Sequence, residues 1–591
     1  MFCCQSNPNR DQKPKNILWQ KDKLTNFTTY IDIFNIKGHK ISLESLNRLF
    51  IGEFSLLKRK GHLKVWTEAG NKLFVKEMWL DAMRAYNMAL PDSIQMEEIY
   101  SLRAPCFYHL KMPEQCLIDL AMIKKCSNGS LPKELQNIEL EARQQISDYN
   151  SSNEGNKSIL FSICEPALDF DEHEKYNGVA NCLEINYNEI FGRHIITTQD
   201  LKIGQTIIVE EPYTIVTSFQ PDGSGSTIRC LSCFQACKNF IACPHCSYGV
   251  FCNEDCIKSS LHKFECNMPV ILFMEGMTKF NLILRLIVRI NDDFPDVNVL
   301  IETVNLLRNG KEVTGLTSDR QKNFCLLFQL VHHHEKLSYH QIEELRKGAA
   351  CVFLTVMRFP EFTNKFNNNF RRQFLQHFIF HLCHFAPHAF RLFENCLIGT
   401  EHEHSLKAFE EKSLYAFAMY PFSSFINHSC IPNVAWFSVG NRLVCKVLRP
   451  IRKGEQIFRT YFSSAYTQSS VSSSLIADFL KYQYQFECKC SICLKECEIH
   501  SNRETNLENN SLYNDAFACE LLSVNAYKNL PLEKIESYIA KGIEFLEEYD
   551  PFHPITKTMT IQRTLMNLWM LSTSRMTFFH RSFYMAVQVR K

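Results

Sequence analysis

Apolar residues follow two different periods along this chain of 591 residues. In residues 61–149, 267–420 and 498–591 they recur every three or four positions, which predicts amphipathic helices. In residues 183–217 and 434–461, short β-branched and aromatic runs alternate with turn residues, which predicts strands. The hydrophobic pattern therefore predicts an α+β protein, and the length allows several domains.

The clearest strand prediction is a hairpin. Residues 434–439 and 442–447 are separated only by the Gly-Asn pair at 440–441, and these residue types favour a two-residue hairpin turn. Two earlier runs, 192–198 and 205–210, are also rich in β-branched residues and are predicted to be strands.

Small and large apolar residues recur near the N-terminus with the thirty-four-residue period of a tetratricopeptide (TPR) helix pair. The matching positions are Gly70, Ala82 and Tyr86 in one copy and Ala104, Cys116 and Leu120 in the next. We expect TPR-like repeats whose groove takes a peptide. An unrelated helical bundle is the alternative, because two repeats are below the usual three.

The Phe-rich segment 267–420 is predicted to be a helical packing region. Its expected helices are residues 270–290, 297–307, 321–330, 338–357 and 370–392. Glu275, Lys279 and Arg285 interrupt the most apolar of them, which excludes a membrane span there. The three histidines at 332–334 are interpreted as a solvated loop, because adjacent side chains on a helix cannot all face one ion.

Composition points to metal sites. Lys and Arg total 65 against 63 Asp and Glu, so no global field attracts nucleic acid or an anionic membrane. The N-terminus lacks the apolar core of a secretory signal, so we expect the reducing cytosol or nucleus. In that environment 26 cysteines are not explained by disulfides, and clustered cysteines indicate metal.

One cysteine cluster has eight closely spaced metal-ligand residues. They are Cys230, Cys233, Cys243, Cys246, Cys252, Cys256, His262 and Cys266. Eight ligands complete two tetrahedral zinc sites, and a closed four-ligand shell is structural and leaves no position for catalysis. Cys237, between them, is interpreted as a small filler residue.

A second, sparser group contains Cys488, Cys490 and Cys493, one thiolate short of a tetrahedral shell. Cys497 would complete the site locally, and Cys430 offers a distant fourth ligand.

The order of the eight ligands resembles the MYND zinc finger. In that family the ligands interleave, which implies Cys230, Cys233, Cys252 and Cys256 on one ion and Cys243, Cys246, His262 and Cys266 on the other. MYND fingers typically bind proline-containing peptides of co-regulators and do not read DNA bases.

Further motifs make the chain similar to the SMYD family, the SET- and MYND-domain protein lysine methyltransferases, in its TPR-bearing branch. They are Gly192-Arg193, Asn427-His428-Ser429-Cys430, Gly454-Glu455, Tyr461 and the second cysteine group. The resemblance implies a split SET β-core with an inserted MYND finger and a helical insert, flanked by helical segments. In order, the expected parts are an unassigned segment (1–60), TPR-like repeats (61–149), a linker (150–182), the SET N-terminal part (183–229), the MYND finger (230–266), the helical SET insert (267–420), the SET C-terminal core (421–465), a post-SET zinc site (466–497) and a C-terminal helical domain (498–591).

The family also implies roles for individual residues. S-adenosylmethionine would lie against Gly192 and Arg193 on one side and Asn427 and His428 on the other. The implied cofactor set also includes His388, Tyr461 and Phe486, and the third zinc would take Cys430, Cys488, Cys490 and Cys493. Tyr461 and Tyr484 would line the channel for the target lysine as catalytic residues.

Three positions depart from the family pattern. His194 stands where Gly is usual and is expected to crowd the cofactor loop, His388 stands at the position of a cofactor-binding Asn, and Phe462 replaces a small residue after Tyr461.

The resemblance implies methyl transfer from S-adenosylmethionine to a lysine of a histone or non-histone protein, in transcriptional regulation. An aromatic channel suits this chemistry, because desolvation helps a lysine lose its proton. The alternative is a catalytically weak adaptor that recruits co-repressors such as deacetylases. We expect a monomer in cytoplasm and nucleus, without direct nucleic-acid or membrane binding.

Overall fold

The computed structural model describes most of the chain in two compact units. The described residues are 60–93, 96–151, 165–189, 191–218, 229–235, 239–243, 249–258, 260–266, 278–331, 334–399, 412–461, 473–490, 493–494, 511–518, 530–552, 556–573 and 577–580. The first unit contains Ile163–Ser218 and Thr278–Met576, together with Met1–Lys37. The second contains Gly38–Ser162, Phe219–Met277 and Thr577–Lys591.

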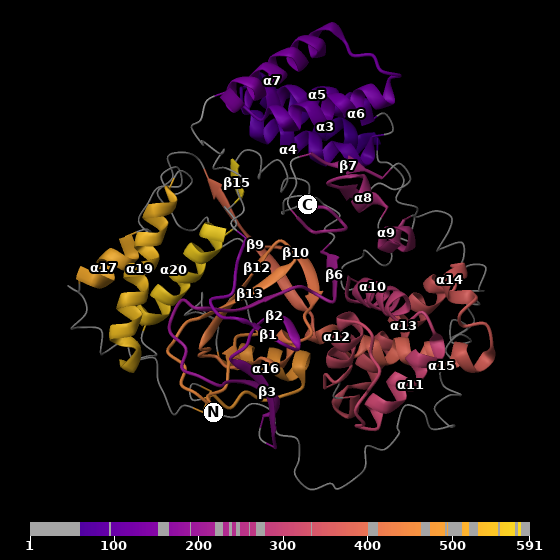
Figure 1. Cartoon of the computed structure of the whole chain (residues 1–591), viewed down its shortest axis with the longest axis vertical. Helices are drawn as coiled ribbons and strands as arrows, with labels where there is room; N and C mark the ends of the chain where they lie inside the picture. Colours follow the sequence, from indigo (N-terminus) through magenta and orange to yellow (C-terminus); the bar gives the residue numbers. More distant parts are fainter. Residues whose placement is uncertain are drawn as a thin grey trace. The chain divides into compact units, whose positions relative to one another are not determined.

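Five helices form the larger part of the second unit (Figure 1). They are α3 (Lys60–Val75), α4 (Trp79–Ala89), α5 (Met96–His109), α6 (Pro113–Cys126) and α7 (Lys133–Ser151). Gly70 lets α3 and α4 approach closely, since a Cβ there would lie 2.4 Å from the Tyr86 ring. The helical prediction for residues 61–149 is confirmed, and the TPR assignment stays a prediction.

The second unit also contains the first cysteine cluster. Its elements are short: β7 (Ile241–Ala242), β8 (Val250–Phe251), α8 (Glu254–Ile257) and α9 (Ser260–Glu265). The two strands pair antiparallel. So little regular structure in its described residues is typical of small segments that a metal ion stabilises.

A buried polar network joins this segment to the helices. The fully buried Arg103 on α5 donates through Nε (2.8 Å) and through one terminal nitrogen (2.7 Å) to the Asp119 carboxylate of α6. That terminal nitrogen also donates to the Phe240 carbonyl at 3.2 Å, and Asn239 Nδ2 donates to Asp119 at 2.7 Å. Because the ion pair is hydrogen-bonded on both sides, its burial is tolerated.

A five-stranded sheet lies at the centre of the first unit (Figure 1). Its order is β1 (Glu172–His173), β2 (Tyr176–Ala180), β5 (Thr206–Glu210), β13 (Arg442–Val447) and β12 (Val434–Val439). The β12–β13 hairpin turns at Gly440, whose φ is 62°, and confirms the hairpin prediction. Cys445 pairs with Ile208, so strands from distant parts of the chain form one sheet.

A second group of strands corrects one helix prediction. Residues 370–392 were expected to form a single helix, but α15 (Asn369–Cys383) ends at Cys383 and is followed by the 3₁₀ turn Ala386–His388. Pro387 in that turn has no backbone N–H and cannot continue the helix. From there β9 (Phe390–Gly399) pairs with β10 (Lys412–Met419), which pairs with β6 (Thr214–Thr217).

The other predicted insert helices are confirmed to within three residues at the ends the structure describes. They are α10 (Thr278–Asp293), α11 (Val297–Arg308), α12 (Asp319–Phe328) and α13 (Tyr339–Val356), with a short α14 (Pro360–Thr363) that was not predicted. Ser338 begins α13 with a capping box completed by Gln341. Residues 270–277, 332 and 333 lie outside the described part, and His334 opens the 3₁₀ turn His334–Lys336.

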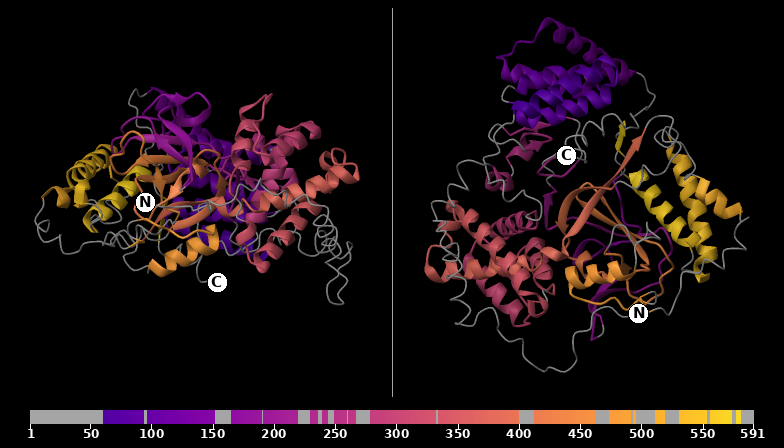
Figure 2. Two further views of the ribbon diagram at one scale, coloured as in Figure 1. Left: turned by 90° about the horizontal axis from the view of Figure 1, so that it is seen from below. Right: turned by 180° about the vertical axis from the view of Figure 1, so that it is seen from behind.

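The C-terminal helices cover the β12–β13 end of the sheet. α17 (Ser511–Phe517), α19 (Leu532–Tyr549) and α20 (Thr556–Thr573) share a core with β12 through Phe437, Phe545 and Trp569. α19 and α20 lie side by side in every view (Figures 1 and 2). The 3₁₀ turn Asp550–Phe552 separates α19 from α20. A last strand, β15 (Thr577–His580), belongs to the second unit.

No helix in the described part of the chain is both long and apolar enough to cross a membrane.

Candidate functional site

The candidate site lies where four short strands of the first unit meet. β3 (Leu183–Asn188) and β4 (Gly192–Thr197) form a hairpin, and β11 (Asn427–His428) runs parallel to β14 (Phe458–Arg459). The Ile457 N–H donates to the Ile195 carbonyl at 2.8 Å, and Asn427 Nδ2 donates to the Phe191 carbonyl at 3.4 Å. This strand crossing brings together residues that the sequence places more than two hundred positions apart.

Gly192 opens β4 and leaves room beside it. Its φ is 64°, a left-handed value that glycine adopts without strain, and an added Cβ would meet no atom within 4 Å. The next residue, Arg193, donates to both the backbone carbonyl and the side-chain oxygen of Gln329. Burial lowers the pKa of its guanidinium. The backbone at Gly192 is therefore open to a ligand, while the Arg193 side chain is held by the helical insert.

His194 lies close to the Gly192 backbone. Its ring is buried, with Nδ1 2.9 Å from the Gly192 carbonyl oxygen and Nε2 3.4 Å from Asn188 Nδ2. Side chains alternate along a strand, so His194 and Arg193 face opposite sides of β4. Both ring nitrogens contact groups of the β3–β4 hairpin itself.

His428 links two parts of the site. The Tyr461 backbone N–H donates to its Nδ1 at 3.0 Å, and its Nε2 lies 3.4 Å from Cys430 Sγ. Burial lowers the pKa of His428, so the ring is neutral. Because Nδ1 accepts a hydrogen bond, the proton is on Nε2 and points at the sulfur. The ring expected to face the cofactor is thus engaged with Tyr461 and Cys430.

The predicted aromatic residues come together beside this ring. The Tyr461 ring centre lies 4.6 Å from Tyr484, at the end of α16 (Ser473–Tyr484), and 6.1 Å from Phe486. The Tyr461 hydroxyl donates to the Ile426 carbonyl at 3.3 Å. Burial raises the pKa of Tyr484, which keeps its phenol protonated at neutral pH.

Sequence reasoning missed Arg459. This residue is 5% exposed, and its guanidinium carbon lies 4.0 Å from the Phe390 ring centre and 4.3 Å from that of Tyr461. The two-residue period of a strand could have indicated it. Residues two apart on a strand share a face, so Arg459 is expected on the same face as Tyr461.

The other two departures from the family pattern are His388 and Phe462. His388 Nε2 lies 2.6 Å from the Val331 carbonyl oxygen, so this nitrogen contacts the insert backbone. Phe462 lies outside the described residues.

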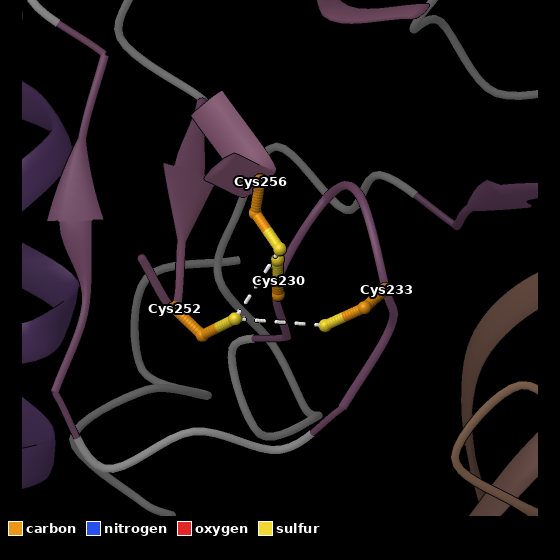
Figure 3. A group of neighbouring side chains, drawn as sticks. All are labelled: Cys230, Cys233, Cys252 and Cys256. Carbon is orange, nitrogen blue, oxygen red and sulfur yellow. Dashed lines mark hydrogen bonds between the residues drawn. The ribbon is translucent and has the colours of Figure 1, made fainter. Parts of the chain in front are cut away.

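The first metal cluster joins Cys230, Cys233, Cys252 and Cys256, whose sulfurs all lie within 4.8 Å of one another (Figure 3). Cys233 and Cys252 Sγ are 3.6 Å apart, and Cys252 and Cys256 Sγ are 3.4 Å apart. Four sulfurs at the tetrahedral zinc distance are separated by about 3.8 Å, whereas a disulfide needs about 2.05 Å. The spacing therefore fits thiolates arranged for one ion.

The second cluster contains Cys243, His262 and Cys266, with the two sulfurs 3.8 Å apart. Burial lowers the pKa of His262, but its hydrogen bonds to Cys243 and Cys266 more than offset this and raise it to about 9. Cys246, the expected fourth ligand, and Cys237 lie outside the described residues.

The third cluster joins Cys430 to Cys488, Cys490 and Cys493. Cys430 Sγ lies 3.9 Å from Cys488 Sγ and 3.6 Å from Cys493 Sγ. The distant residue therefore completes this set of four, as the resemblance implies. Cys497 lies outside the described residues.

Comparisons with known proteins agree with this arrangement. The SET domain family model matches residues 192–462. Histone-lysine N-methyltransferase ASHR1 of Arabidopsis thaliana is 25% identical over 326 residues, which cover 55% of this chain and 57% of that protein. Protein-lysine N-methyltransferase SMYD4 of Mus musculus is 20% identical over 596 residues, which cover 82% and 73%.

Two further similarities come from a slime mould and from a solved structure. A SET and MYND domain-containing protein of Dictyostelium discoideum is 25% identical over 53% of this chain and 82% of its own length. The crystal structure of the SET domain of LSMT bound to lysine and AdoHcy aligns with 71% of this chain and 88% of its own, at 9% identity and a TM-score of 0.24, which is too low to compare the folds. The SET match and the SET-and-MYND relatives support placing the chain in the SMYD family.

Proposed function

We propose that the chain is an S-adenosylmethionine-dependent protein-lysine N-methyltransferase. The observation that carries this proposal is the convergence of Gly192, Asn427, Tyr461 and Tyr484 at one strand crossing. The lysine methyltransferase names of ASHR1 and SMYD4 support the same reaction class. Protein substrates with an exposed lysine, histone or non-histone, follow from that class.

The residues at the crossing fit the cofactor. Gly192 leaves open space, the Asn427 amide is buried beside it, and Phe486 offers a ring face near His428, with 6.2 Å between ring centres. Gly192, Arg193, Asn427, His428, Tyr461 and Phe486 would hold S-adenosylmethionine, with His388 at the insert side. When bound, S-adenosylmethionine supplies an electrophilic methyl group on a sulfonium.

The protein has to align an uncharged amine and exclude water. Tyr461 and Tyr484 are placed for this task, because their rings pack at 4.6 Å and form one aromatic wall. Their hydroxyl groups orient the amine, and the rings make the surroundings apolar. Such surroundings disfavour the charged form of a lysine.

We propose that zinc fills all three ligand clusters, with Cys246 completing the second. The first and third clusters each offer four thiolates, and Cys246 would give the second cluster three thiolates and an imidazole. Such four-donor shells are typical of structural zinc. The third cluster has a particular role, because Cys430 follows Asn427 and His428 after one residue. It holds the segment that carries Tyr484 and Phe486 against the strand crossing.

The adaptor function remains the second candidate. It is favoured by the contact between His388 Nε2 and the Val331 carbonyl, which occupies a nitrogen that the cofactor would need. In that case the finger and the TPR-like helices would recruit co-repressors or deacetylases. Localisation in cytoplasm and nucleus and a monomeric state are also proposals.

Two measurements separate the candidates. An enzyme binds S-adenosylmethionine and transfers labelled methyl groups to core histones or a lysine peptide library, and Tyr461→Phe lowers the transfer with three zinc ions retained. An adaptor keeps its partner recruitment in an Asn427→Ala/His428→Ala variant and shows no transfer in the parent protein. Failure to bind the cofactor at millimolar concentration refutes the methyltransferase proposal.

A further inference from the structure

Arg459 is a buried cation. Within the described part of the chain its Nε has no hydrogen-bond partner, and one terminal nitrogen donates to the Thr460 carbonyl at 3.5 Å, the limit of a hydrogen bond. Among the residues that the structure describes, no carboxylate lies within ion-pair distance of it. Buried charges are normally paired, so this one needs an explanation.

Aromatic rings surround the guanidinium instead. Phe390, Trp436 and Tyr461 lie at 4.0, 5.7 and 4.3 Å from its carbon. Ring faces partly compensate a cation but leave its net charge in place. Burial lowers the pKa of Arg459, yet an arginine is not deprotonated in proteins. The site therefore contains a permanent positive charge.

The ionisable groups that face Arg459 do not neutralise it. These groups are Cys445 of β13, His428 of β11, Tyr484 at the end of α16, and Tyr461, which follows Arg459 in the chain. Arg391 of β9 adds a second positive charge on the Tyr484 side. None of these groups is a carboxylate, so the field behind the two tyrosines is positive.

We propose that Arg459 is a further functional residue of the site, whose charge keeps the target lysine in its neutral form. The inference rests on the proposed function, because it takes Tyr461 and Tyr484 as the channel wall. A like charge disfavours an ammonium group. At an effective dielectric constant of about 20, a charge roughly 7 Å away lowers the pKa of that lysine by about one to two units.

The proton leaves to solvent before the transfer. The lysine nitrogen then uses its lone pair to form a bond to the methyl carbon, the carbon–sulfur bond breaks with its electrons kept by sulfur, and the positive charge moves to nitrogen. Arg459 slightly opposes this movement of charge to nitrogen. It therefore speeds the reaction only at pH values at which the lysine in the site would otherwise be protonated.

Because these two effects oppose each other, the pH profiles of the parent protein and of a variant without the charge should cross. Arg459→Met removes the charge and keeps an apolar side chain of similar length, whereas Arg459→Lys keeps the charge. We expect kcat of the Met variant, measured at saturating concentrations of the best peptide of a lysine library, to fall about tenfold at pH 7 and to equal or exceed the parent above pH 10, a shift of about one unit in the midpoint. The Lys variant should follow the parent profile.

A binding measurement provides a second readout. With S-adenosylhomocysteine present, calorimetry of the same peptide in two buffers of different ionisation enthalpy counts the protons released on binding. The parent should release more than the Met variant at pH 8. Zinc content and S-adenosylhomocysteine affinity verify folding, and Arg442→Met, a partly exposed arginine on β13, is the matched control.

The outcomes are distinct. Parallel pH profiles, or equal proton release, overturn the role of Arg459 while methyl transfer stands. No transfer to any probe and no cofactor binding by the parent protein overturn the proposed function, and the inference with it.

Discussion

The backbone N–H of Tyr461 donates to Nδ1 of His428 at 3.0 Å. On its other side the same ring lies 3.4 Å from Cys430 Sγ. One imidazole therefore connects the proposed lysine channel with the third metal cluster. The stretch from Asn427 to Cys430 is a junction, in which the amide lies beside Phe191, the imidazole holds Tyr461, and the thiol belongs to the cysteine cluster.

Replacing His428 should displace Tyr461. His428→Ala leaves the Tyr461 N–H without its buried acceptor, and losing such a bond costs about 1–3 kcal/mol. We expect methyl transfer to fall at least tenfold, with S-adenosylmethionine affinity affected less than turnover. His173→Ala, at a partly exposed histidine of β1, is the control and should leave the rate unchanged. A normal rate in His428→Ala would remove the imidazole from the positioning of Tyr461.

Cys430→Ser should act on the cofactor site at a distance. The serine hydroxyl is a poor ligand beside three thiolates, so the protein should bind about one zinc fewer. Because Cys430 follows Asn427 and His428 so closely, we expect S-adenosylmethionine affinity to drop as well. Zinc analysis and cofactor titration test this, with the exposed Cys126→Ser as control. Loss of zinc with unchanged affinity would separate the third cluster from cofactor binding.

Short-range patterns predicted much of the fold. The β12–β13 hairpin follows from strand alternation around a two-residue turn. The two cysteine groups that the structure describes in full agree with those that the family resemblance implied. The strand β9 was missed, because the apolar run after Pro387 is equally compatible with a buried helix or strand. Only the partner strand β10 decides between them, and that pairing is tertiary information.

The site was predictable only in part, for a similar reason. Tyr461 and Tyr484 were identified through the family pattern and do come together. The hydrogen bonds of His428 were not predictable, because they depend on the register in which β11 meets β14. Arg459 was missed because an arginine within a strand is usually exposed, and nothing local indicates that three aromatic rings enclose this one.

Breaking the Arg103 network should destabilise the second unit. Arg103→Met leaves the buried Asp119 carboxylate without its cation, which costs about 3–5 kcal/mol. Because Phe240 and Asn239 share the network, we expect the first cysteine cluster to release zinc at a lower urea concentration. Arg143→Met removes an exposed pair with Glu139 and should cost less than about 1 kcal/mol. Equal stability of the two variants would show that the network is dispensable.

Glu210 gives the fold a pH dependence of its own. This buried carboxyl accepts the backbone N–H groups of Phe422 (2.7 Å) and Ser423 (2.9 Å), which begin the turn leading into Asn427. Burial raises its pKa to about 7, although its hydrogen bonds with Ser423 and Phe422 act against this. The ordinary pKa of a glutamate is 4.5. Between that pH and about 7, the folded protein therefore retains a proton on Glu210 that the unfolded chain has lost.

The sign of the effect follows from proton linkage. Between about pH 4.5 and 7 the folded state binds more protons at Glu210 than the unfolded state, so this group makes the free energy of unfolding fall as pH rises. Glu210→Gln removes the ionisable group. The difference in unfolding free energy between parent and variant should shift by up to about 3 kcal/mol in favour of the variant from pH 4.5 to 7, and then level off. Taking the difference cancels the pH dependence that zinc ligation gives both proteins. A flat difference for Glu210→Gln would mean that this carboxyl is ionised in the folded state throughout the range.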